Sequence, residues 1–126
     1  MMLTGYVLSG LIAVAIVLIG ARFLFAPATA ASGYGVDASP SSLSAVRPWL
    51  AVKGLRDIVS GLFLALLMTN GSPRLLGEFL MIASLIAWGD AVIVLRSGGH
   101  RAAAFGIHGA TALLIVVAGA ILIAAR

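Results

Sequence analysis

Residues 3–21 read LTGYVLSGLIAVAIVLIGA, a stretch without a single charged side chain. An α-helix needs about 20 predominantly apolar residues to cross the hydrocarbon core of a bilayer. Backbone N–H and C=O groups in hydrocarbon must be paired within a helix or a closed barrel, and a continuous rather than alternating apolar run excludes the barrel. The first Lys or Arg is Arg22, so the run lacks the basic start of a signal peptide. The stretch therefore predicts a retained membrane-spanning helix.

The composition extends this prediction to the whole chain. Of its 126 residues, 62% are hydrophobic and 10% are charged, and the mean hydropathy is +1.17. So few charges cannot form the surface of a soluble globular domain, and lipid must cover much of this one. Cysteine is absent, which excludes thiolate metal sites, disulfide exchange and cysteine nucleophiles. The basic residues are scattered, so we expect no nucleic-acid partner.

Three more apolar segments follow the first one. Pro27 ends the first segment, Pro48 opens the second in the favoured first-turn position, and the short later connections make successive segments antiparallel neighbours. The expected fold is all-α, an up-down antiparallel four-helix transmembrane bundle, multi-pass in a cell membrane of the bacterial inner-membrane type. The first connection is long enough to hold a short interfacial helix or to lie over the bundle mouth. The single domain comprises residues 1–126, with spans at about 5–26, 48–69, 74–95 and 102–125.

Two ionisable residues near the second connection, Arg74 and Glu78, are expected to form an interfacial ion pair. Six others lie inside the predicted spans near the first or third connection. Such groups cost several kcal/mol in the membrane centre and normally face a bundle interior or a cavity. With an even number of crossings, the first and third connections lie on the same side, and a rise of about 1.5 Å per residue then places all six in one half of the membrane. They are Arg22, Lys53, Arg56, Asp57, Asp90 and His108.

This convergence predicts a buried polar pocket that binds or converts a lipophilic small molecule. His108 with Asp57 or Asp90 would be the catalytic acid–base pair, because imidazole titrates near neutral pH and a carboxylate orients it. The sequence does not decide which carboxylate partners His108, or whether the protein is an enzyme. Three cations, Arg22, Lys53 and Arg56, are predicted to bind an anionic or carbonyl oxygen of the ligand. Trp49 and Trp88 are predicted to form aromatic walls of the pocket, or alternatively to anchor the helices at the membrane interface.

Two other functions are consistent with the same residues. One is a proton-coupled small-molecule carrier, and the other is an assembly subunit in which the paired charges only fix the helix register. We expect no cofactor or metal, because the two histidines lack a ligand spacing. The expected partners are membrane lipid and a lipophilic ligand. Small residues such as Gly54, Gly61 and the series Ala102, Gly106, Ala110 predict close helix packing, with a homo-oligomer face as the alternative.

Several short motifs carry a resemblance to a known family. They are RFLFAP at 22–27, Trp49 with KGLRD at 53–57 and Gly61, then Gly89-Asp90 and His108-Gly109. With these motifs the chain resembles the small four-helix membrane proteins described as domain of unknown function 4267, broadly similar in plan to DoxX-like proteins. The resemblance covers nearly the whole chain, and Arg56-Asp57 is its most specific element. It implies the four-helix fold and no established activity. DoxX relatives are linked to quinone and respiratory contexts, but no residue here carries that role over.

Overall fold

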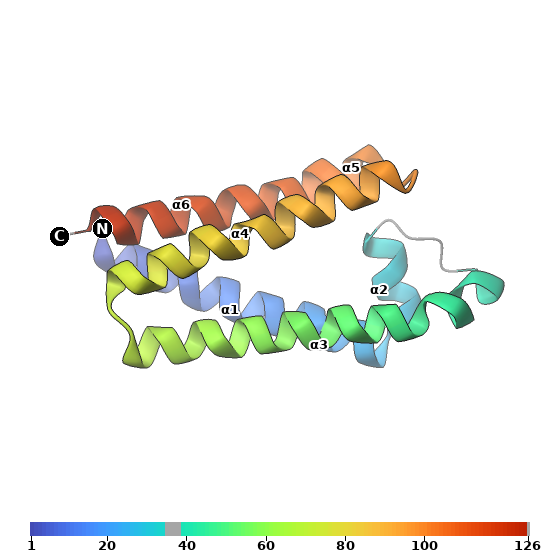
Figure 1. Cartoon of the computed structure of the whole chain (residues 1–126), viewed down its shortest axis with the longest axis horizontal. Coiled ribbons are helices and arrows are strands. Elements are labelled where there is room, and N and C mark those ends of the chain that lie inside the picture. Colours follow the sequence, from blue (N-terminus) through green and yellow to red (C-terminus); the bar gives the residue numbers. More distant parts are fainter. Residues whose placement is uncertain (35–38, 126) are drawn as a thin grey trace.

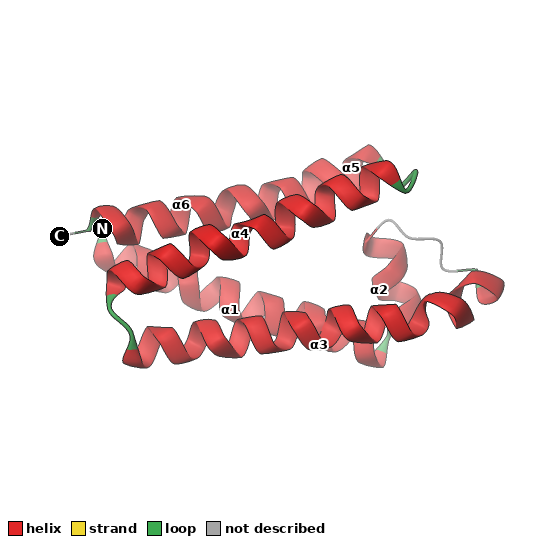
Figure 2. Ribbon diagram, in the orientation of Figure 1, coloured by secondary structure: helices red, strands yellow, loops and turns green. Residues whose placement is uncertain are grey.

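The computed structural model describes residues 1–34 and 39–125, and within them the chain forms helices and no strand. Segments α5, η1 and α6 follow one another without a break, so residues 101–124 form one continuous rod. Short loops connect the long helices (Figure 2). The helices are α1 (Met2–Phe25), α2 (Pro27–Tyr34), α3 (Pro40–Asn70), α4 (Pro73–Arg96), α5 (Arg101–Ala103), the π-helix η1 (Ala104–Gly109) and α6 (Ala110–Ala124).

The long helices are arranged as two pairs. Helix α1 packs mainly against α3, and α4 packs mainly against α6, whereas α3 and α4 touch only slightly. Both termini and the α3–α4 turn lie at one end of the molecule, while α2 and the α4–α5 loop lie at the other (Figure 1). The two pairs diverge toward the end that carries α2. The expected close packing of residues 48–69 on residues 74–95 is therefore wrong for most of their length.

Glycines bring the backbones together within each pair. A Cβ atom on Gly54 of α3 would lie 2.7 Å from the carbonyl oxygen of Gly20 on α1, and one on Gly20 would lie 2.6 Å from that of Gly54. Gly77 of α4 and Gly119 of α6 face each other in the same way, at 2.8 and 2.9 Å. Such contacts allow helices in lipid to associate by close van der Waals packing. The predicted packing role of Gly54 is confirmed.

The prediction that the series Ala102, Gly106 and Ala110 packs within the bundle is wrong, whereas its alternative as a homo-oligomer face stays a prediction. All three residues are exposed, and a Cβ atom on Gly106 would meet nothing within 4 Å. The buried face of this rod contains Ala104, His108 and Ala112 instead.

Helix α3 begins earlier than the sequence predicts. It starts at Pro40, so Pro48 lies inside the helix rather than at its first turn. A proline there cannot donate to the carbonyl of Ser44, but both residues are exposed and water can replace the lost partner. Leu43 and Val46 pack on a small apolar cluster shared with α1 and α2. This tertiary contact stabilises the additional turns.

In the part of the chain that the structure describes, three helical segments are long and apolar enough to cross a membrane, by length and composition: Met2–Phe25, Pro73–Arg96 and Arg101–Ala124. Their outer faces carry exposed large apolar side chains such as Leu18, Leu85 and Leu113. Apolar surface on that scale indicates contact with lipid rather than water. The chain is thus a multi-pass helical membrane protein.

Candidate functional site

Lys53 on α3 is the centre of a cluster of four charged side chains. Its Nζ atom lies 2.6 Å from Oδ2 of Asp57, one turn further along α3, and 3.3 Å from Oδ2 of Asp90 on α4. Arg56 approaches the same carboxylates from outside, with its Nη2 atom 3.4 Å from Asp57 Oδ1 and 3.5 Å from Asp90 Oδ1. These four residues, the charge cluster, have a formal charge of zero. They connect α3 to α4 where the helix pairs diverge.

The members of the charge cluster differ in burial. Asp57 and Asp90 are buried, whereas 44% of the Arg56 side chain is exposed. Lys53 lies between these extremes, with 15% of its side chain exposed. A buried charge is tolerated only when it is paired and hydrogen-bonded. Lys53 pairs with both carboxylates, and the hydrogen bonds come from Lys53 to Asp57 and from Arg56 to Asp90. Arg56 reaches them from the surface.

Two aromatic rings cover the ammonium group of Lys53. Its Nζ atom lies 4.9 Å from the ring centroid of Phe23 on α1 and 4.8 Å from that of Tyr34 on α2. Both distances are within the range of a cation–π interaction. The two rings meet edge to face, with their centroids 5.7 Å apart. Two carboxylates and two aromatic faces therefore enclose the ammonium group.

Tyr34, at the end of α2, joins the charge cluster to the last rod. Burial, reinforced by interaction with the nearby Asp90 carboxylate, raises the pKa of Tyr34 above its ordinary value. The phenol is therefore a neutral hydrogen-bond donor over the physiological pH range.

His108 lies on the other side of Tyr34. The two rings are in edge-to-face contact, with centroids 4.4 Å apart. Only 8% of His108 is exposed, and its Nε2 atom is buried without a hydrogen-bond partner among the described residues. A buried polar atom in this condition is uncommon and calls for a physical explanation.

The local backbone around His108 is also unusual. His108 belongs to η1, a π-helical turn between α5 and α6. Such turns are rare and frequently occur at functional sites. The turn buries Ala104 and His108, and it leaves Phe105 and Ile107 exposed. It thus directs the imidazole toward α2 and α3.

The charge cluster, Tyr34 and His108 border a cavity of about 310 Å³. Lys53, Asp57, Asp90, Tyr34 and His108 form its polar part. The cavity reaches the protein surface, because five of its lining residues are exposed: Ile19 and Arg22 of α1, Thr29 and Gly33 of α2, and Ile107 of η1. The remaining wall is mainly apolar and includes Ile16, Ile19, Ile86, Ala87 and Ile115.

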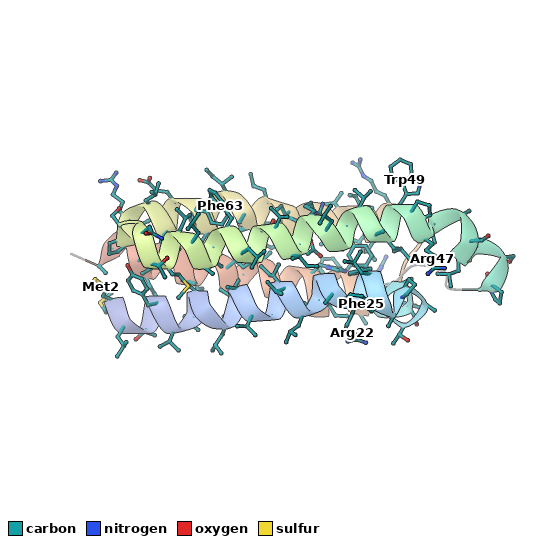
Figure 3. The ribbon with its side chains drawn as sticks, turned by 90° about the horizontal axis from the view of Figure 1, so that it is seen from below. Met2, Arg22, Phe25, Arg47, Trp49 and Phe63 are labelled. Atoms are coloured by element: carbon teal, nitrogen blue, oxygen red, sulfur yellow. The ribbon has the colours of Figure 1, made fainter. Side chains whose placement is uncertain are left out.

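The structure thus brings together Lys53, Arg56, Asp57, Asp90 and His108. Arg22 is exposed at the cavity rim, and Figure 3 shows it at the end of the molecule that also carries Phe25 and Arg47. Among the described residues, no hydrogen bond joins His108 to a carboxylate. No group of three His, Asp or Glu side chains in the described ranges is placed to hold a metal ion.

The two tryptophans lie away from the cavity. Trp49 is 74% exposed and projects from the outer surface (Figure 3), whereas its neighbour Leu50 is buried. Consecutive helical residues point roughly 100° apart, so both cannot face inward. Trp88 is 44% exposed, and its separation of two residues from Asp90 turns it roughly 200° away around α4. Neither tryptophan lines the cavity, contrary to the expectation of an aromatic wall.

Phe23 and Tyr34 are the aromatic lining residues that the sequence analysis missed. Tyr34 is in the first connection, which was expected to form a short helix or to cover the bundle mouth. The available signal for Tyr34 as a lining residue was its position shortly after the end of the first predicted membrane span. Phe23 follows Arg22 in an apolar stretch, where nothing distinguishes it from its neighbours.

Comparison with known proteins identifies the family. Residues 13–122 match the model described as domain of unknown function (DUF4267). The chain belongs to this family. No curated protein and no solved structure matches it. The part that matches DUF4267 contains every residue that lines the cavity, so the cavity lies within the family domain and not in an appended segment.

Proposed function

We propose that this DUF4267 protein crosses a cell membrane four times, with α3 as the fourth span. Helix α3 is the longest helix, and after Asp57 its outer face presents Val59, Leu62 and Leu66. Its charges do not oppose insertion, because the charge cluster pairs them within the protein. The broad similarity to DoxX-like proteins stays a prediction.

The proposed function of the cavity is to bind a lipophilic small molecule with one polar group. The observation that carries this proposal is a cavity of about 310 Å³ in which one polar side, formed by Lys53, Asp57, Asp90, Tyr34 and His108, meets a mainly apolar wall. Small-molecule sites are typically apolar pockets with a few polar groups that fix the orientation of the ligand. The apolar walls around Ile19, Ile86 and Ile115 would hold the rest of the molecule.

The position of the opening favours a ligand that arrives from the bilayer. The rim contains Ile107 of η1 and Arg22 near the end of α1. An exposed arginine near a helix end extends toward the lipid headgroups, while the isoleucine faces the chains. A molecule dissolved in the membrane can therefore enter sideways between α1 and η1.

Binding is better supported than acid–base catalysis. Both carboxylates are engaged by Lys53 and Arg56, and within the described residues the imidazole of His108 has no hydrogen bond to either of them. Conversion of a ligand by His108 with Asp57 or Asp90 would require a carboxylate to leave Lys53. That chemistry stays a prediction from the sequence.

The proposal is tested by calorimetry on the full chain in detergent with 1-decanol or its methyl ether, 1-methoxydecane, as probe. Ala87→Phe places a ring in the cavity wall, whereas Ala110→Phe places the same ring on an exposed face of α6. We expect saturable binding in the unmodified protein and in Ala110→Phe, with at least tenfold weaker binding in Ala87→Phe. Equal binding by all three, or none above the partition into micelles, would refute the cavity as a ligand site.

A second candidate is a structural role for the charge cluster in membrane assembly. The favouring observation is that the cluster is neutral, internally paired and fastens α3 to α4. Under this alternative, the protein purifies with a partner subunit in fixed stoichiometry, and Ala87→Phe leaves that association unchanged. A proton-coupled carrier stays a prediction from the sequence.

A further inference from the structure

We infer that the end of the molecule that carries α2 is a binding surface for the headgroups of anionic phospholipids. Four exposed arginines form this surface, and each comes from a different long helical segment: Arg22, Arg47, Arg96 and Arg101, the end arginines. The surface requires no ligand in the cavity, and its α3 part rests on the fourth span proposed above.

The end arginines lie together because of where the helices begin and end. Arg22 belongs to the last turn of α1, Arg96 is the last residue of α4, and Arg101 is the first residue of α5. These helix termini lie at the end of the molecule with α2 and the α4–α5 loop (Figure 1). Arg47, in the first part of α3, lies at the same end as Arg22 (Figure 3). Each long helical segment therefore contributes one guanidinium group to this end.

The positive charge of the end arginines is not balanced by nearby acids. All four are exposed, and within the described ranges none of their side chains forms an ion pair. The chain has four acidic residues. Asp57 and Asp90 are paired in the charge cluster, Glu78 is paired with Arg74 at the opposite end, and Asp37 lies outside the described residues. Even if Asp37 is counted in full, four arginines minus one acid leave three positive charges.

The end arginines also mark the border of the lipid-facing surface. On three of the four segments, an exposed apolar side chain lies four residues further into the helix, on the same face and about 5.4 Å deeper. The pairs are Arg22 with Leu18, Arg96 with Val92, and Arg101 with Phe105. On α3, Arg47 is followed by Trp49, which is 74% exposed, and tryptophan is enriched at the membrane–water interface. With the apolar side chains among the lipid chains, the guanidinium groups reach the phosphates.

The chemistry of arginine favours a phospholipid with a net negative charge. A guanidinium group can form two parallel hydrogen bonds with a phosphate. The phosphate of a zwitterionic lipid already has a positive group of its own headgroup beside it, whereas that of phosphatidylglycerol does not. One arginine near an anionic lipid surface gains about fivefold in affinity from this difference. A free phosphate ion lacks the chains that would cover Leu18, Val92 and Phe105.

The test uses Trp49 as a reporter of the lipid beside Arg47. The chain has two tryptophans, so Trp88→Phe leaves Trp49 as the single one. The full chain with this substitution is reconstituted in phosphatidylcholine vesicles that contain increasing fractions of dibrominated phosphatidylglycerol or dibrominated phosphatidylcholine. Quenching of Trp49 by the brominated chains gives the relative association constant of the two lipids. We expect phosphatidylglycerol to be preferred about fivefold, and Arg47→Gln to lower this ratio to about twofold or less.

Arg74→Gln is the matched control, because it removes an arginine from the opposite end and should leave the ratio unchanged. Replacement of chloride by inorganic phosphate at equal ionic strength should also leave it unchanged, and a fall in phosphate would overturn the inference in favour of a free anion. Equal association of the two lipids while Arg47 is present, no change in Arg47→Gln, or the same loss in Arg74→Gln would overturn it and leave the fourth span standing. If neither lipid quenches Trp49, the fourth span fails as well.

Discussion

Replacing Gly54 by alanine tests whether backbone contact between α1 and α3 holds this side of the cavity together. The new Cβ atom would lie 2.7 Å from the Gly20 carbonyl oxygen and 3.0 Å from Cβ of Phe23. Ordinary contact begins at 3.4 Å, so the helices must separate by about 0.7 Å, which is 3.4 minus 2.7. The two nearest atoms are a backbone oxygen and a Cβ atom, which cannot move aside without the helix, and only the third, Leu24 Cγ at 3.2 Å, belongs to a flexible side chain.

The expected loss of unfolding free energy follows from two opposing effects. Overpacking of a well-packed contact costs about 1–3 kcal/mol. Alanine gains roughly 0.5–1 kcal/mol over glycine in a helix because its unfolded backbone is less free. The net expectation for Gly54→Ala is a loss of up to about 2.5 kcal/mol, with a central value of about 1 kcal/mol. Gly89→Ala is the matched control, since a Cβ atom there meets nothing within 4 Å and only the gain applies.

The measurement is reversible unfolding of the full chain in mixed micelles, followed by helical circular dichroism. Gly54→Ala should unfold at a lower denaturant concentration than the unmodified protein, and Gly89→Ala at the same or a higher one. If Gly54→Ala is as stable as Gly89→Ala, the reasoning from the close contact is refuted. Because Phe23 and Lys53 flank this contact, Gly54→Ala should also weaken binding of 1-decanol.

Two further predictions concern the polar part of the site. Asp90→Asn removes one partner of Lys53 but leaves Asp57, and Arg56 is partly solvated. We therefore expect a loss of about 1–3 kcal/mol in unfolding free energy. The control Glu78→Gln breaks the exposed 2.9 Å pair with Arg74 and should leave the unfolding midpoint unchanged. A larger loss of stability in Glu78→Gln than in Asp90→Asn would contradict the assigned difference in burial between the two pairs. Tyr34 has a raised pKa in the folded protein, so its stabilising contribution is present below the unfolded pKa of about 10 and is lost as the pH rises above it. The unfolding free energy should therefore fall more steeply at alkaline pH in the unmodified protein than in Tyr34→Phe, and parallel pH profiles would show that the phenol is not held neutral.

Parts of the site follow directly from the spacing of residues along the sequence. Lys53 and Asp57 are four residues apart, so any helix that contains both places them on one face. Asp90 and His108 were expected at the same membrane depth as Lys53 because depth depends only on helix length and the number of crossings. The ion pair between Arg74 and Glu78 at the far end follows from the same spacing and is confirmed at 2.9 Å.

Other parts depend on the direction in which each helix turns its side chains. The expected aromatic lining, Trp49 and Trp88, points outward, while Phe23 and Tyr34 supply the rings that meet Lys53. Helix orientation about its own axis is set by contacts such as that of Gly20 with Gly54. When most residues are apolar, the hydrophobic pattern that reveals the inner face of a soluble helix is nearly absent, so the sequence could not predict these directions.

Composition and the lengths of the apolar runs were enough to establish a helical membrane protein, because the cost of unpaired backbone groups in lipid applies to every residue alike. The rings at the cavity, the π-helical turn that buries His108 and the divergence of the two helix pairs around α2 arise from contacts between residues far apart in the chain. These contacts depend on the shapes of packed surfaces, and no local pattern of residues encodes them.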